Sequence, residues 1–141
     1  MSVEIPELMG IELSGIHVNN PLDIIKLSEQ GVTKRTLIHI GKLLSLRQKD
    51  LAEMVSVSLR TLQRYDDSRK LTPLVSENII LITEVIRLGL EVFEDIDIFT
   101  KWLNNPNKAL NQKKPLYLLK FRSGSNLVQD ILGQIKYGIV A

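Results

Sequence analysis

The stretch QKDLAEMVSVSLRTLQRY, residues 48–65, predicts two short helices that cross at a tight connection. We expect one helix over residues 48–54 and another over residues 58–66. Ala52 falls where two crossing helices come closest, and its small side chain permits that approach. The pair cannot bury its apolar faces alone, so the rest of the chain must cover them. In the second part of this stretch, the side chains expected to point toward the core are those of Val57, Leu59 and Leu62.

The outward side of the second helix carries hydrogen-bond donors suited to reading DNA. An Arg can pair bidentately with guanine, a Gln can pair with adenine, and a Thr can reach a base or a phosphate. Arg69 and Lys70 follow closely enough to help neutralise phosphates. The alternative interpretation is a pair of packed helices with a solvated basic face. The predicted DNA-binding residues are Gln48, Lys49, Ser58, Arg60, Thr61, Gln63 and Arg64.

Helical signals continue on both sides of this stretch, and no convincing strand pattern appears. A long helix is expected from Pro73 to about Phe93. A last helix is expected after Ser123, closed by Gly138. The other residues expected to cap helix starts are Asn20, Thr33, Thr72 and either Asp95 or Asp97.

These signals predict an all-α fold with three parts. Residues 1–19 are expected to be an amino-terminal arm, because they lack helical periodicity. Residues 20–72 are expected to form a helix-turn-helix DNA-binding domain, and residues 73–141 a small helical domain.

Charge alternates along the chain, although the formal net charge is only +2. Residues 36–75 carry 7 basic against 4 acidic residues, and residues 106–141 carry 6 against 1. Residues 1–35 and 76–105 are acidic by comparison. Either basic block could meet phosphate, whereas the second acidic block is expected to be a solvated face.

The residues also argue against several classes of function. The chain has no cysteine, and His17 and His39 are far apart in sequence, so we expect no metal site. No phosphate loop, nucleophile elbow or HExxH motif is present, so we expect neither an enzyme nor a cofactor. Charged residues interrupt the most apolar window, residues 78–93, which argues for a core helix rather than a membrane span. Without a visible export signal, we expect the chain to be cytoplasmic.

The stretch at residues 48–65 resembles a helix-turn-helix of the Xre repressor type. Gln48 opens the first helix, Ala52 lies at the crossing point, and Leu62 belongs to the core of the recognition helix. Ser56 departs from the pattern, since that turn position is commonly Gly and Ser requires some backbone adjustment.

The second half resembles the carboxy-terminal domain of the Xre/MbcA/ParS antitoxin family, found in RES/Xre toxin-antitoxin modules. The likeness covers residues 37–141 and departs from the family at Glu94, often Gly, and at Asn111-Gln112, usually a Gly-rich turn. The residues that carry it are the VFED that ends the long helix, Trp102, Leu103, Pro106, Asn107, Ala109, Leu110, Pro115, Leu116, Leu118, Leu119, Gly124, Val128, Leu132, Ile135, Tyr137 and Gly138.

The resemblance implies a RES-domain toxin that consumes NAD or transfers ADP-ribose as the partner, blocked by this chain at its active-site entrance. It also implies that operator DNA of the chain's own operon is bound, and helix-turn-helix geometry then favours a homodimer. The other candidate is a one-component transcription regulator whose second domain dimerises or senses a ligand. The residues expected to bind the toxin are Lys136, Tyr137, Gly138, Ile139, Val140 and Ala141.

Overall fold

The computed structural model describes residues 20–138, and this part of the chain is built from helices. Within it, the isolated bridges Thr33 with Lys70 and Asn107 with Lys113 are the only strand-like pairings. The predicted all-α fold is therefore confirmed. In chain order the helices are α2 (Pro21–Gln30), α3 (Lys34–Leu43), α4 (Gln48–Met54), α5 (Leu59–Arg64), α6 (Pro73–Phe93), α7 (Ile96–Leu103), the 3-10 helix η2 (Lys108–Leu110), α8 (Pro115–Leu118) and α9 (Arg122–Lys136).

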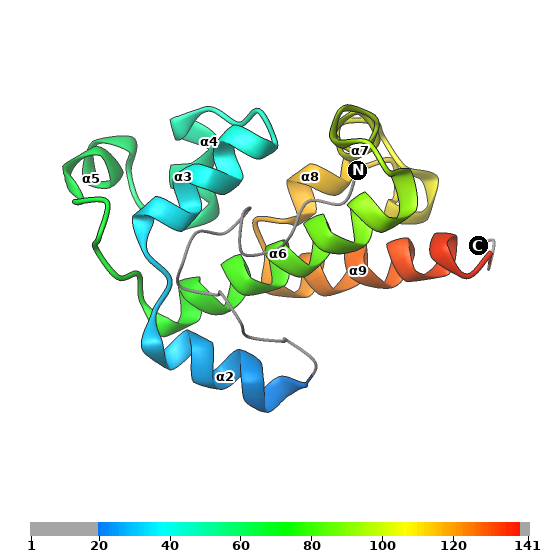
Figure 1. Cartoon of the computed structure of the whole chain (residues 1–141). Coiled ribbons are helices and arrows are strands. Elements are labelled where there is room, and N and C mark those ends of the chain that lie inside the picture. Colours follow the sequence, from blue (N-terminus) through cyan, green and yellow to red (C-terminus); the bar gives the residue numbers. More distant parts are fainter. Residues whose placement is uncertain (1–19, 139–141) are drawn as a thin grey trace.

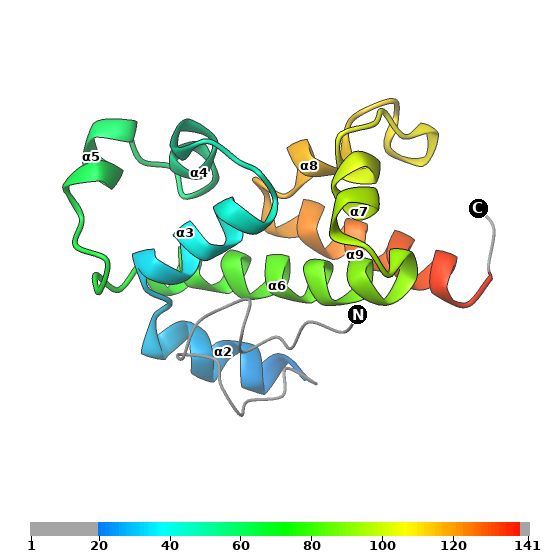
Figure 2. The ribbon, with the colours of Figure 1, turned by 45° about the horizontal axis from the view of Figure 1, so that its top comes forward.

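The long helix α6 is the axis around which the other helices pack. Figures 1 and 2 show α2 on one side of α6, and α3, α4, α7 and α8 on the opposite side. α9 lies beside α6 and runs in the same direction. Ser125 bonds to Asn78 near the start of both helices, and Lys136 bonds to Glu91 near their ends.

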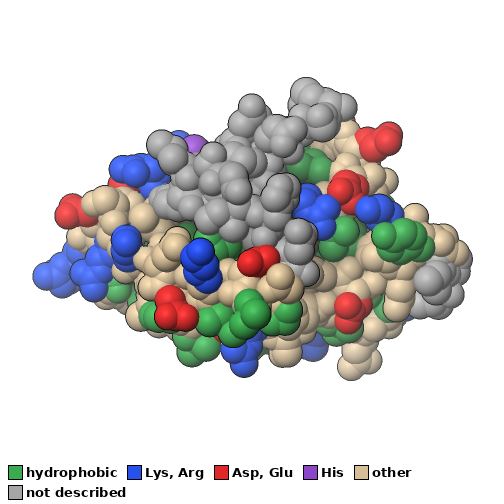
Figure 3. Space-filling model, turned by 60° about the horizontal axis from the view of Figure 1, so that its bottom comes forward, with side chains coloured by type: hydrophobic (Ala, Val, Ile, Leu, Met, Phe, Trp, Pro, Cys, Tyr) green, Lys and Arg blue, Asp and Glu red, His purple; other side chains and the backbone are tan. Residues whose placement is uncertain are grey.

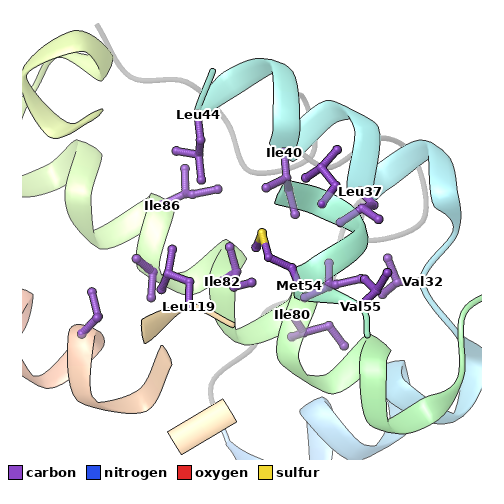
Figure 4. Packing of buried hydrophobic residues seen from close by; sticks show 14 of the residues in the cluster. Val32, Leu37, Ile40, Leu44, Met54, Val55, Ile80, Ile82, Ile86 and Leu119 are labelled. Carbon is purple, nitrogen blue, oxygen red and sulfur yellow. The ribbon is translucent and has the colours of Figure 1, made fainter. Parts of the chain in front are cut away.

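Buried hydrophobic side chains from both halves of the chain form one core. Figure 4 shows side chains of α3 and α4 facing those of α6, with Leu119 close by. Each fully buried Leu or Ile contributes about 1.5–3 kcal/mol, so this shared core ties the two halves together. The predicted domain boundary between residues 72 and 73 falls at the start of α6 and stays a prediction. The core residues labelled in Figure 4 are Val32, Leu37, Ile40, Leu44, Met54, Val55, Ile80, Ile82, Ile86 and Leu119.

Side chains cap most of the helices where the sequence predicts it. The side chains of Asn20, Thr33, Thr72 and Asp95 each accept a backbone hydrogen bond at the start of α2, α3, α6 and α7. The expectation that Ser123 caps the last helix is wrong. α9 begins at Arg122 with Phe121 in the cap position, so Ser123 lies inside the first turn.

Two glycines allow side chains or backbone to approach a helix closely. A Cβ added to Gly124 would lie 2.0 Å from the carbonyl oxygen of Leu118, so α9 can meet the end of α8 only with Gly there. A Cβ on Gly89 would lie 2.3 Å from the ring of Phe99, which is fully buried against α6. Trp102 is half-buried and stacks on Phe99 with ring centroids 6.3 Å apart.

The three turns in which the sequence departs from a family glycine have left-handed backbone at four residues. Ser56 has φ of 58°, Glu94 has φ of 59°, and Asn111 and Gln112 have φ of 58° and 66°. Glycine reaches this region without a Cβ penalty and Asn tolerates it, whereas residues such as Ser, Glu and Gln are strained there. The turns therefore keep the shape that glycine favours, at the cost of local strain.

Candidate functional site

α4 and α5 form the crossed pair that the sequence predicts, joined by a turn at Val55 to Ser58. The turn is closed by backbone bonds from Ser56 to the carbonyl of Glu53 (3.2 Å) and from Val57 to that of Ala52 (3.1 Å). Ala52 is buried at the crossing, which confirms its predicted place.

Fewer side chains in and next to α5 face the core than the sequence predicts. Leu62 is fully buried and Val57 is half-buried, but Leu59 is 37% exposed, so the prediction that it points inward is wrong. Leu59 is the first residue of α5, where the short helix turns away from the core.

Arg60, Gln63 and Arg64 lie exposed on α5, and Thr61 is half-buried. Within the described residues the two arginines form no ion pair, so their guanidinium groups are open to a partner. Arg60 and Arg64 are four residues apart and therefore share one side of the helix. This arrangement provides donors whose geometry suits base edges in a major groove.

Ser58 is committed to the helix start. Its hydroxyl accepts a bond from the backbone N–H of Thr61 at 3.0 Å and donates to the Thr61 hydroxyl at 2.9 Å. Ser58 is thus the N-cap of α5 rather than its first residue. Because Ser is a preferred N-cap residue, this capping role alone is enough to explain why a Ser stands beside the other predicted DNA-binding residues.

Gln48 and Lys49 are exposed at the start of α4. Arg47 precedes them and was not among the predicted contacts. Its side chain is 78% exposed and lies 3.4 Å from Asp50. The sequence could have identified Arg47 as a further candidate, because it is a basic residue directly before Gln48 and Lys49.

Arg69 and Lys70 are exposed after α5. The guanidinium of Arg69 lies 4.3 Å from the centre of the Tyr65 ring. Lys34 of α3, by contrast, is buried, and its ammonium donates to the carbonyl of Tyr65 at 2.9 Å. That bond satisfies the end of α5 and helps to fix its direction.

The carboxy-terminal candidates begin at the end of α9. The Lys136 ammonium binds Glu91 of α6 at 2.7 Å, and Glu91 also accepts a bond from Arg87 at 2.8 Å. The bond from Lys136 lowers the pKa of the Glu91 carboxyl. In turn, Glu91 raises the pKa of Lys136. Lys136 is therefore paired with a residue of α6, so its charge is less available to a toxin than the sequence indicates.

Tyr137 is 73% exposed, and its ring centre lies 5.5 Å from the Lys136 ammonium. Gly138 follows with φ of 71°, a conformation suited to glycine at a helix end. Figures 1 and 2 show α9 extending beyond the end of α6, so this segment stands clear of the helices around it. Ile139, Val140 and Ala141 lie outside the described residues.

The described part of the chain holds neither a metal-binding cluster nor a membrane-spanning helix. Over residues 20–138, no group of three His, Cys, Asp or Glu side chains is placed to hold a metal ion. In the same range, none of the helices has both the length and the apolar content needed to cross a bilayer.

Two protein families match the chain in succession. The family described as the antitoxin Xre-like helix-turn-helix domain matches residues 23–83. The family described as the antitoxin Xre/MbcA/ParS C-terminal toxin-binding domain matches residues 88–138. Together the matches span most of the chain and adjoin within α6. No curated protein shows a significant match.

Proposed function

This chain is an antitoxin of the Xre/MbcA/ParS type, and on that premise we propose that it inhibits a RES-domain toxin and represses its own operon. The toxin would consume NAD or transfer ADP-ribose, and the antitoxin would cover its active-site entrance. The observation that carries the proposal is the order of the two matched domains, with a helix-turn-helix followed by a toxin-binding domain.

For the DNA-binding function, the proposal assigns base contacts to Arg60, Thr61, Gln63 and Arg64. It assigns phosphate contacts to Gln48 and Lys49, with Ser58 fixing the start of α5. The exposure of the two arginines and their position on one side of α5 support this assignment. Because a single helix-turn-helix covers few base pairs, we propose a homodimer that presents two α5 helices about one DNA turn apart.

For the inhibitory function, the proposal assigns the toxin contact to residues 136–141. The exposed ring of Tyr137 and the projection of α9 beyond α6 support this assignment. Lys136 is bound to Glu91, so its part would be to hold the end of α9 in place unless the toxin displaces that bond.

The test is to express the neighbouring gene with and without this chain and to measure growth and cellular NAD. We expect the neighbour alone to stop growth and deplete NAD, and this chain to restore both. A neighbouring toxin that is neutralised while NAD stays constant would contradict the RES assignment alone. A harmless neighbour would overturn the inhibitory function and favour the one-component regulator.

Repression needs a separate measurement, because inhibition does not require DNA binding. We expect this chain to lower expression of a reporter driven by the promoter upstream of its gene. The Arg60→Ala/Arg64→Ala double variant should lose repression but keep toxin inhibition. A double variant that represses fully would contradict the assignment of α5 as the reading helix.

A further inference from the structure

The fold brings the second basic block of the sequence next to the helix-turn-helix. A groove of about 450 Å³ lies between α4 and α8. Arg47 and Asp50 line it on one side, and Lys114, Tyr117 and Lys120 line it on the other. Figure 1 shows α4 and α8 as neighbours on the same side of α6. Residues more than sixty positions apart in sequence therefore share one surface.

An ion pair joins the two sides next to this groove. The Lys120 ammonium binds the Glu53 carboxylate of α4 at 2.7 Å. The Tyr117 ring lies close to two cations, with the ammonium of Lys113 at 5.0 Å and that of Lys120 at 5.3 Å from its centre. These contacts hold the lysines around α8 at a defined place relative to α4.

Two of these lysines keep their charge available. Lys113 and Lys114 are exposed, and neither forms an ion pair with any of the described residues. Arg47, across the groove, is also exposed. The acidic residues nearby are already engaged, Asp50 with Arg47 and Glu53 with Lys120. The surface of Lys113, Lys114, Tyr117 and Lys120, here named the α8 surface, is therefore net basic.

We propose that the α8 surface binds the phosphate backbone of duplex DNA beside the segment read by α5. The proposal rests on the proposed DNA-binding function and extends it into the domain matched as toxin-binding. Duplex DNA carries one negative charge per 1.7 Å or so of its axis, so a strand that passes Lys49 at the start of α4 presents further phosphates to neighbouring cations. The sign and the position of the α8 surface favour DNA over the toxin.

The test measures binding of the full chain to a duplex of arbitrary sequence over a range of salt concentrations. Each lost phosphate contact reduces the slope of log affinity against log salt by about 0.9. We expect Lys114→Gln to lower the slope by that amount and to weaken binding on the order of fivefold near 0.15 M salt. Lys113→Gln/Lys114→Gln should double the change in slope. Lys114→Arg should keep the wild-type slope.

Matched variants separate the proposal from its premise. Lys26→Gln removes an equal charge from α2, on the opposite side of α6, and should leave the slope unchanged. Lys49→Gln should reduce the slope like Lys114→Gln. If Lys49→Gln lowers the slope and the double α8 variant does not, the α8 surface does not bind DNA and this inference is overturned.

Two other results would also overturn it. A wild-type chain without salt-dependent DNA binding would remove the proposed DNA function as well. A double variant with an unchanged slope but weaker toxin inhibition would assign the α8 surface to the toxin interface. Circular dichroism of each variant checks that the helical content and the thermal midpoint are those of the wild type.

Discussion

Arg60 and Arg64 show how single residues on α5 divide between the surface and the core. Both side chains extend from one exposed side of the helix, while Leu62 between them is fully buried in the core. Ser58 caps the start of the helix, with its hydroxyl bonded to Thr61. A substitution at Leu62 or Ser58 would therefore change stability, whereas one at either arginine is expected to change binding.

Replacing Arg64 by Ala is predicted to weaken specific operator binding by about 1–3 kcal/mol, because a bidentate pair with guanine would be lost. Arg64→Lys is the matched control, since it keeps the charge but not the planar fork of donors. Titration of each variant against the operator and against an unrelated duplex measures the change in specific and in nonspecific affinity. Equal losses on the two duplexes would contradict base reading by Arg64.

Glu94 gives the second prediction at the scale of the residue. It is exposed, it follows α6 at φ of 59°, and no hydrogen bond of its side chain explains that conformation. Glu94→Gly should raise the free energy of unfolding by about 1 kcal/mol, because glycine removes the left-handed penalty, partly offset by greater freedom in the unfolded chain.

Ser123→Gly is the control for that substitution, because Ser123 is exposed and helical. Glycine there should lower the free energy of unfolding by about 0.5–1 kcal/mol. Chemical denaturation of both variants measures the difference. Destabilisation by Glu94→Gly would mean that the Glu94 side chain supports the α6–α7 turn.

At the scale of the element, α9 is attached to α6 near both of its ends. Near its start a buried relay runs from the Ser125 hydroxyl to the Asn78 side chain and on to the carbonyl of Leu119, with bonds of 2.8 and 2.9 Å. Near its end the attachment is the exposed pair of Lys136 and Glu91. The buried relay fixes the register, whereas the exposed pair depends on pH and salt.

The pair at the end of α9 predicts a pH dependence. Glu91 has a lowered pKa in the folded chain, so its contribution is present above the unfolded value near 4.5 and is lost as pH falls through the folded value. Lys136→Met should shift the Glu91 pKa upward, because the hydrogen bond that lowers it most is removed. NMR titration of the Glu91 carboxyl measures the shift. An unchanged pKa would mean that the bond does not persist in solution.

At the scale of the whole molecule, DNA binding and toxin inhibition are expected to separate at opposite ends of the fold. Figure 2 shows α5 at one end and the end of α9 at the other. Deleting residues 137–141 should leave DNA affinity unchanged and strongly reduce toxin inhibition, because most of the proposed toxin contact, including the exposed Tyr137, is removed. Operator titration and toxin assay of the same preparation measure both. Full inhibition by the truncated chain would place the toxin contact on the helices before it.

Local physics alone was enough to predict most of the elements. Helix caps, proline at first helical positions and apolar spacing act within a few residues, which is why α2, α3, α6 and α7 begin where Asn20, Thr33, Thr72 and Asp95 predict. The family resemblance, rather than local physics, singled out Ser56 and Glu94 as positions where glycine is common, and both have left-handed backbone. The sequence also indicated both family resemblances, the helix-turn-helix domain and the carboxy-terminal domain that follows it. Both are confirmed by the family matches.

The sequence by itself determined which segments are helices, where most of them begin and most of the polar side chains that α5 exposes. Only the tertiary structure decided that Lys114 stands across a groove from Arg47, that Lys136 is bound to Glu91, and that Leu59 is exposed. The physical reason is distance along the chain. Caps and helical periodicity depend on near neighbours, whereas these placements depend on how α6 packs against helices that are tens of residues away.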